Sequence, residues 1–224
     1  MNTRTQAYLL LLFGGALIRL AAGDALLRYV RPVARPWVLL AGTGLLVIAI
    51  AQLIQQRRTD SRLPGSVRSG WLLLAPVVAI VVIAPPALGS FSAEHAAVGV
   101  VDTSTQKEFP PLTGPAPHRL SLLDFTTRVL WDSGRTVAGQ DVQLTGFILS
   151  ERPDGFVLAR LVITCCAADA RPVEIFVTSP TRPAKGGWVS VVGRYQGTDP
   201  SQPLFPRMAA TEVQPATEPA NPYD

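Results

Sequence analysis

The distribution of apolar residues divides the chain into two parts with different patterns. Three long apolar runs occupy the first part, at residues 8–29, 37–54 and 71–89. Each run has about 18 to 22 residues, and a helix of that length is about as long as the hydrocarbon core of a bilayer is thick. We therefore predict three transmembrane helices within residues 1–90, in contact with the lipid bilayer.

The second part begins with a segment that has no periodicity. It contains "KEFPPLTGPAPH", which is rich in Pro and Gly, and this composition predicts an extended linker over residues 91–119. The chain's two histidines, His95 and His118, both lie in this segment and far from the cysteines in sequence. We interpret them as solvated side chains and not as metal ligands.

A short helical pattern follows in "SLLDFTTRVLWDSG". Leu122, Phe125 and Val129 recur on one helical face, as in an amphipathic helix. Ser121 is a suitable N-cap with an acidic residue three positions later, and a glycine follows the last turn. The pattern predicts one short helix over residues 121–133.

Strand patterns then replace the helical pattern until close to the end of the chain. Five segments carry them: residues 141–149, 156–165, 173–178, 188–195 and 208–213. Five short strands separated by turn residues predict a small β-barrel, similar to the OB-fold, over residues 120–215, with a Pro-rich tail at 216–224. Gly146 and Gly193 interrupt strands where a closed barrel needs bends. The predicted fold class is therefore an α+β membrane protein: three transmembrane helices, then an OB-like five-stranded barrel with one short helix.

The charge distribution leads to two further predictions, one on nucleic-acid binding and one on membrane orientation. Residues 1–90 contain nine Arg and two Asp, whereas residues 91–224 contain eleven Lys or Arg and fourteen Asp or Glu. Because the basic excess flanks the helices and the barrel is mildly acidic, we predict that the protein does not bind nucleic acid. Four Arg residues lie within 57–68, so the positive-inside rule places this loop in the cytoplasm and the barrel outside it. The predicted location is the cell membrane, with several spans and an extracytoplasmic C-terminal domain.

Two charges interrupt the first apolar run. Arg19 and Asp24 either pair with each other or with a partner subunit inside the membrane, or they extend to the outer interface. We keep both as candidate intramembrane partner contacts.

The chain's two cysteines are adjacent, in "RLVITCCAADARP". If the strand ends between them, one thiol is buried and its neighbour lies at the strand exit near Asp169. Four interpretations remain open for Cys165 and Cys166: a zinc site within one chain, a soft-metal site completed by a partner or a second copy, a disulfide or redox pair, and simple packing of two small side chains. The candidate thiol or metal site is thus Cys165, Cys166 and Asp169, and the only cofactor considered is a soft metal ion at the two cysteines.

Several motifs resemble those of the YcgQ-like permease subunits, a family of uncharacterised bacterial membrane proteins. They are "GFIL", "LARLVITCCAADARP", "WVSVVGRY" and the closing "EPANPYD", together with "YVRPVARPW" after the first apolar run. The resemblance covers nearly the whole chain, and "CCAADA" is its most specific element. It implies that the protein pairs with a larger, multi-spanning permease.

The leading hypothesis is therefore an accessory subunit of a two-component permease, whose barrel docks over the partner's outer face. A membrane-anchored thiol oxidoreductase or soft-metal-binding protein is one alternative, and an envelope scaffold or signalling module is another. The sequence has no Gly-x-Ser-x-Gly and no phosphate-binding Gly loop, so it supports neither a serine hydrolase nor an ATPase. We do not expect an enzyme, with thiol oxidoreductase as the only enzyme class considered.

Overall fold

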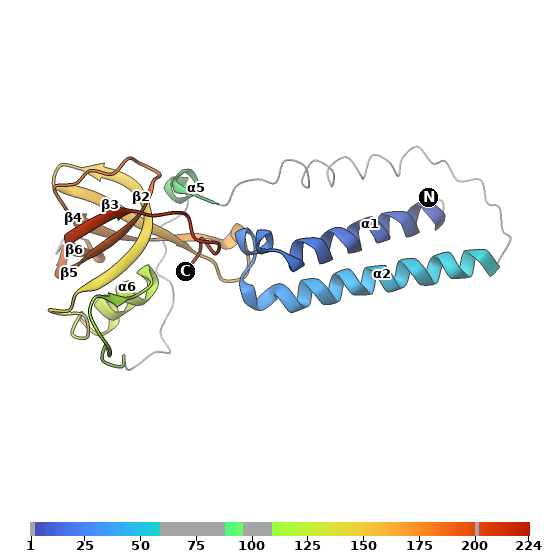
Figure 1. Ribbon diagram of the computed structural model, residues 1–224, viewed down its shortest axis with the longest axis horizontal. Helices are drawn as coiled ribbons and strands as arrows, with labels where there is room; N and C mark the ends of the chain where they lie inside the picture. Colours follow the sequence, from blue (N-terminus) through green and yellow to red (C-terminus); the bar gives the residue numbers. More distant parts are fainter. Residues whose placement is uncertain (1–2, 59–87, 96–108, 200–201) are drawn as a thin grey trace. The chain divides into compact units, whose positions relative to one another are not determined.

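The computed structural model describes residues 3–58, 88–95, 109–199 and 202–224 (Figure 1). The chain forms two compact units, residues 1–87 and residues 88–224. The first unit contains paired helices and the second contains the β-strands.

Two helices joined by two short 3-10 helices make up the described part of the first unit: α1 (Thr3–Ala22), η1 (Asp24–Arg28), η2 (Pro32–Ala34) and α2 (Arg35–Arg58). The helices approach closely at two glycines, because a Cβ on Gly14 would lie only 2.8 Å from the carbonyl oxygen of Gly42. Arg35 closes the connection, since its Nε donates to the carbonyl oxygen of Ala21, 2.6 Å away, at the end of α1.

The described residues do not support three transmembrane helices. By length and composition, one helix, Pro32–Gln55, could cross a membrane. The apolar stretch described in α1, Gln6–Ala22, is shorter. The third predicted span, 71–89, lies almost entirely outside the described residues.

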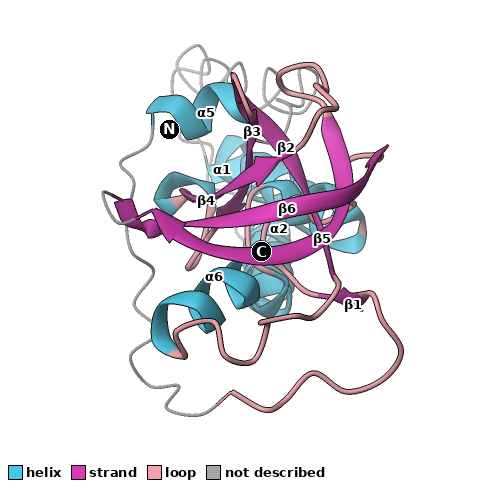
Figure 2. Ribbon diagram, turned by 90° about the vertical axis from the view of Figure 1, so that its left-hand side faces the viewer, coloured by secondary structure: helices cyan, strands magenta, loops and turns pink. Residues whose placement is uncertain are grey.

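Six strands form the sheet of the second unit: β1 (His118–Arg119), β2 (Val142–Arg152), β3 (Gly155–Val162), β4 (Arg171–Thr178), β5 (Trp188–Asp199) and β6 (Gln202–Pro215). The order is β1-β2-β3-β4-β6-β5, and β2 also pairs with β5, which closes a five-stranded barrel (Figure 2). Strands β4 and β6 are parallel, and the other neighbours in the barrel are antiparallel. The predicted five-stranded barrel is confirmed; the extra strand β1, parallel to β2, was not predicted.

The predicted short helix is also confirmed, as α6 (Leu122–Trp131). Its N-cap is Ser121, whose Oγ accepts a hydrogen bond from the backbone N–H of Asp124 at 3.0 Å. Leu122 and Phe125 are fully buried and belong to the core inside the barrel, so the apolar face of α6 packs against the strands (Figure 2).

A second apolar cluster lies on the outer face of β2, β3 and β4. Phe147, Val157 and Leu161 belong to it, and it is covered by Ala93 of helix α5 (Ser90–His95) and by Tyr223. Strand β3 is therefore buried on both faces. The C-terminal tail, expected only as a Pro-rich extension, packs on the barrel.

The two predicted bend positions behave differently. At Gly193 the β5–β6 register shifts, and a Cβ would collide with the backbone carbonyl of Ala209, so this bend is confirmed. At Gly146 the pairing with β5 continues without a shift, and a Cβ would lie 2.6 Å from the carbonyl oxygen of Ala159. Glycine is needed at Gly146 because two strands approach closely there.

Candidate functional site

Strand β3 leads directly into the cysteine loop, but it ends three residues earlier than predicted, at Val162 and not at residue 165. The reason is local hydrogen bonding by Asp169. Its carboxylate accepts the backbone N–H groups of Thr164 and Cys165, each at 2.8 Å. Since these donors are no longer available to a neighbouring strand, the chain leaves the sheet and turns through η3 (Ala167–Asp169) before β4 begins.

The loop brings together the three candidate residues. The Sγ atoms of Cys165 and Cys166 are 3.7 Å apart, and the Sγ of Cys165 donates to Oδ2 of Asp169 at 3.0 Å. One ligand atom from each residue lies within 4.8 Å of the other two. The expectation that one thiol is buried was wrong: Cys165 is exposed and Cys166 is half-buried, because both follow the end of the strand.

Hydrogen bonding to Asp169 controls the protonation of Cys165. It raises the pKa of the Cys165 thiol to about 11, with further contributions from Cys166 and from desolvation. The same hydrogen bond, together with the backbone N–H donors, lowers the pKa of the Asp169 carboxyl to about 2. At neutral pH the pair is therefore a thiol that donates to a carboxylate.

This arrangement is poorly suited to thiol redox catalysis. A nucleophilic cysteine needs a lowered pKa, usually from a neighbouring positive charge or a helix N-terminus, whereas Cys165 faces a carboxylate. The two sulfur atoms are also well beyond the S–S bond length of about 2.05 Å, and both cysteines are free. Two sulfur donors and one carboxylate oxygen are instead ligands that a thiophilic metal ion accepts.

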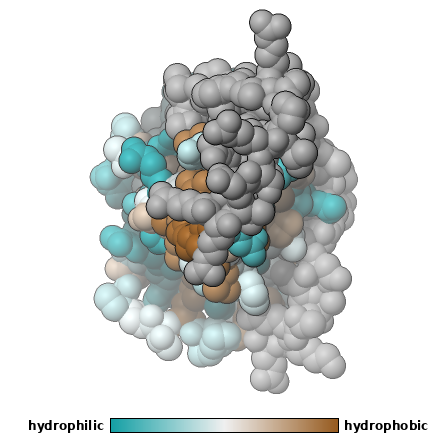
Figure 3. All heavy atoms as spheres, turned by 90° about the vertical axis from the view of Figure 1, so that its right-hand side faces the viewer, coloured by the Kyte–Doolittle hydropathy of each residue, from teal (hydrophilic) through white to brown (hydrophobic). Residues whose placement is uncertain are grey.

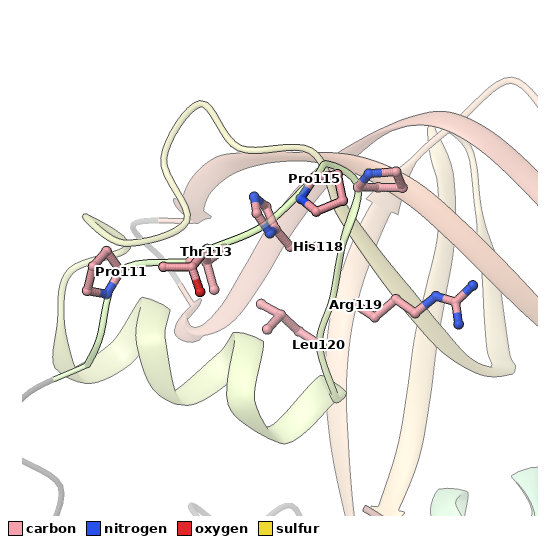
Figure 4. Close-up of a pocket in the computed structure, with 8 residues that line it drawn as sticks. Pro111, Thr113, Pro115, His118, Arg119 and Leu120 are labelled. Carbon is pink, nitrogen blue, oxygen red and sulfur yellow. The ribbon is translucent and has the colours of Figure 1, made fainter.

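The other candidate residues lie elsewhere in the chain. Arg19 and Asp24 are both exposed, and the ion pairs of the described residues do not join them to each other. His118 begins β1 and lines a hollow of about 500 Å³, which also includes Pro115 (Figure 4). All the residues around this hollow come from segment 111–120, so it does not gather distant chemical groups.

The contact between β3 and the C-terminal tail was not predicted from the sequence. The guanidinium of Arg160 on β3 lies 2.9 Å from Oδ1 of Asp224 and also donates to the carbonyl oxygens of Asn221 and Tyr223. The backbone N–H of Asp224 donates to the carbonyl oxygen of Leu161 at 2.9 Å. The tail thus braces the strand that leads into the cysteine loop. A single Arg inside the apolar segment "FVLARLVI" was the available signal.

Among known proteins, the similarity that is found lies in the barrel unit. No curated protein matches the chain. A family model described as the DUF1980 C-terminal domain matches residues 128–223. The matched range contains the last four residues of α6, the closed barrel, the cysteine loop and the C-terminal tail except Asp224. Residues 128–223 of this chain are therefore similar to the DUF1980 C-terminal domain.

Proposed function

We propose that this chain is the accessory subunit of a two-component membrane permease, with its barrel docking on the outer face of a larger, multi-spanning partner. The resemblance to the YcgQ-like subunits motivates the proposal, and the DUF1980 C-terminal domain is consistent with it. The barrel is OB-like in its strand order, which closes through the parallel pair β4–β6. In this proposal the chain spans the membrane three times and the barrel lies outside the cytoplasm, as the Arg distribution predicts.

The observation that carries the proposal is the distribution of exposed apolar side chains. Among the described residues, ten of the eleven large apolar side chains that are exposed belong to the helical unit: Tyr8, Leu12, Phe13, Val33, Trp37, Leu40, Val47, Ile48, Ile50 and Ile54. The other one, Trp131, belongs to the barrel unit. Figure 3 shows apolar side chains gathered where the helices face the viewer. Such a surface is stable in lipid or against apolar helices of another protein.

One stripe on α2 is a suitable partner surface. Leu40, Val47 and Ile54 are 49 to 64% exposed and recur every seven residues, so they lie on one face of the helix. Gly42, which contacts α1, lies on a different face. In the proposed complex this stripe contacts the permease, and the exposed Arg19 and Asp24 offer charged contacts to it.

Photo-crosslinking during purification tests the proposal. The tagged full chain would carry a photoreactive residue at position 47, on the stripe, or at position 46, where the Leu46 side chain packs beside Gly14 of α1. After purification from native membranes in mild detergent, we expect a stoichiometric multi-spanning partner that forms adducts from position 47. Position 46 should give adducts within the chain.

Two results would contradict the proposal: a chain that purifies alone with adducts to lipid only, or a partner whose yield and adducts are the same for an unrelated tagged membrane protein. Adducts between position 47 and a soluble or peripheral envelope protein would favour the scaffold alternative. Thiol redox chemistry is disfavoured by the Cys165–Asp169 contact described above.

A further inference from the structure

Two of the three separations among the ligand atoms of Cys165, Cys166 and Asp169 are close to those that a tetrahedral metal ion requires, and the third is no more than 4.8 Å. Two thiolates bound to zinc at about 2.3 Å lie about 3.8 Å apart at the tetrahedral angle. The observed separation of the Cys165 and Cys166 sulfur atoms is 3.7 Å. A thiolate and a carboxylate oxygen on the same ion would lie about 3.6 Å apart. The distance from the Cys165 Sγ to the Asp169 Oδ2 is 3.0 Å. It would increase by only about 0.6 Å when an ion replaces the proton that the two atoms share.

The carboxylate is held in place by the backbone. Both oxygens of Asp169 accept backbone N–H groups, Oδ1 from Thr164 and Oδ2 from Cys165. Each carboxylate oxygen has a second lone pair, so Oδ2 can keep its N–H donor and still bind an ion. Such outer hydrogen bonds orient a metal ligand before the metal arrives.

We propose that Cys165, Cys166 and Asp169 form a binding site for one thiophilic divalent cation of the zinc type, held by two thiolates and one carboxylate oxygen. Each ligating thiol releases its proton to solvent as the ion binds. One doubly charged ion enters and two protons leave, so the net charge of the cluster stays at that of the single carboxylate.

The site suits an ion that exchanges. Structural zinc sites have four protein ligands, whereas this loop supplies three and leaves one position open. Cys165 is exposed, so another ligand can reach that position from solvent. If the proposed accessory-subunit function is correct, on which this step rests, the ion is the cargo of the permease and the loop receives or delivers it.

Metal titration of the reduced full chain in detergent tests the site. Zn²⁺ affinity would be measured by competition with a chromophoric chelator, and Cd²⁺ would report sulfur ligation through its thiolate charge-transfer band. We expect one ion per chain. Cys165→Ser and Cys166→Ser should each weaken Zn²⁺ binding by at least about tenfold and reduce the band, while Asp169→Asn weakens binding and keeps the band. Glu151→Gln, which changes an exposed carboxylate elsewhere on the barrel, should match the unmodified protein.

Three results would overturn the site: no cadmium–thiolate band in the reduced chain, a band that persists in the Cys165→Ser, Cys166→Ser double variant, or one ion bound by two chains. Circular dichroism of each variant shows whether the fold is kept. The band depends on sulfur ligation, so it remains informative if a variant is less stable. A partner that co-purifies with a chain that binds no metal would refute only this site. Metal binding without a partner would refute only the accessory-subunit function.

Discussion

Replacing Asp169 by Asn should make Cys165 more reactive, because the substitution removes the negative charge that disfavours its thiolate. The hydrogen bond to Asp169 is the largest cause that raises the Cys165 pKa from its ordinary 9.0 to about 11. If Asp169→Asn restores the ordinary value, the thiolate fraction at about pH 8 rises about 90-fold. A thiolate of lower pKa is less nucleophilic, with a Brønsted coefficient of about 0.4 to 0.5, which reduces this gain by about tenfold. The expected net effect is alkylation of Cys165 about ten times faster.

The assay needs one reporting thiol, so both proteins would carry Cys166→Ser. Iodoacetamide modification of the full chain in detergent would be followed by mass spectrometry over a pH series that spans the ordinary thiol pKa. The Asp169→Asn profile should move to lower pH, while the Glu151→Gln control should not move. Equal or slower alkylation of the Asp169→Asn protein would refute the assignment of the raised pKa to this carboxylate. Equal alkylation rates of the two proteins after denaturation would show that their difference in reactivity depends on the folded cysteine loop.

Three further predictions concern stability. Arg160→Ala leaves the buried Asp224 carboxylate, whose side chain is 2% exposed, without its cation and should destabilise the barrel by about 3 to 5 kcal/mol in denaturant melts of the full chain; a change near zero would show that the tail does not brace β3. Gly193→Ala should cost about 1 to 3 kcal/mol because the new Cβ meets the Ala209 carbonyl, and an unchanged melting temperature would contradict this. The lowered pKa of Asp169 means that its loop is stabilised above pH 3.8 and loses this contribution as pH falls toward 2. Hydrogen exchange of the Thr164 and Cys165 backbone amides, which donate to this carboxylate, should show protection that falls in that pH range once intrinsic rates are corrected for. Constant protection would contradict the hydrogen bonds to Asp169.

The elements that the sequence predicted well are those specified by neighbouring residues. The α6 helix has its N-cap and its apolar face within one short segment, so local pattern and structure agree. The barrel strands are short apolar segments separated by turn residues, so they could be recognised, and Gly193 marks a real bend because the β6 backbone passes close to it. Strand β1 has two residues, which is too short to produce a pattern.

The cysteine loop was predicted only in part. The sequence singled out three residues whose side chains lie together in the structure, since adjacent thiols followed by an acidic residue are recognisable in any context. It extended the strand through Cys165 because "VITC" has strand propensity, and the Asp169 carboxylate overrides that propensity by accepting the backbone donors. The bracing tail could not be predicted, because Arg160 and Pro222 are 62 residues apart in sequence and make their contact only in the folded barrel.

The most direct test of the metal site is the X-ray absorption spectrum of the zinc-loaded full chain. The proposed ligands predict two sulfur atoms at about 2.3 Å and oxygen ligands at about 2.0 to 2.2 Å, from Asp169 and from the open position. In the Cys165→Ser, Cys166→Ser double variant the sulfur shell should disappear. A zinc ion surrounded only by oxygen or nitrogen in the unmodified protein would contradict the site and the cargo inferred from it.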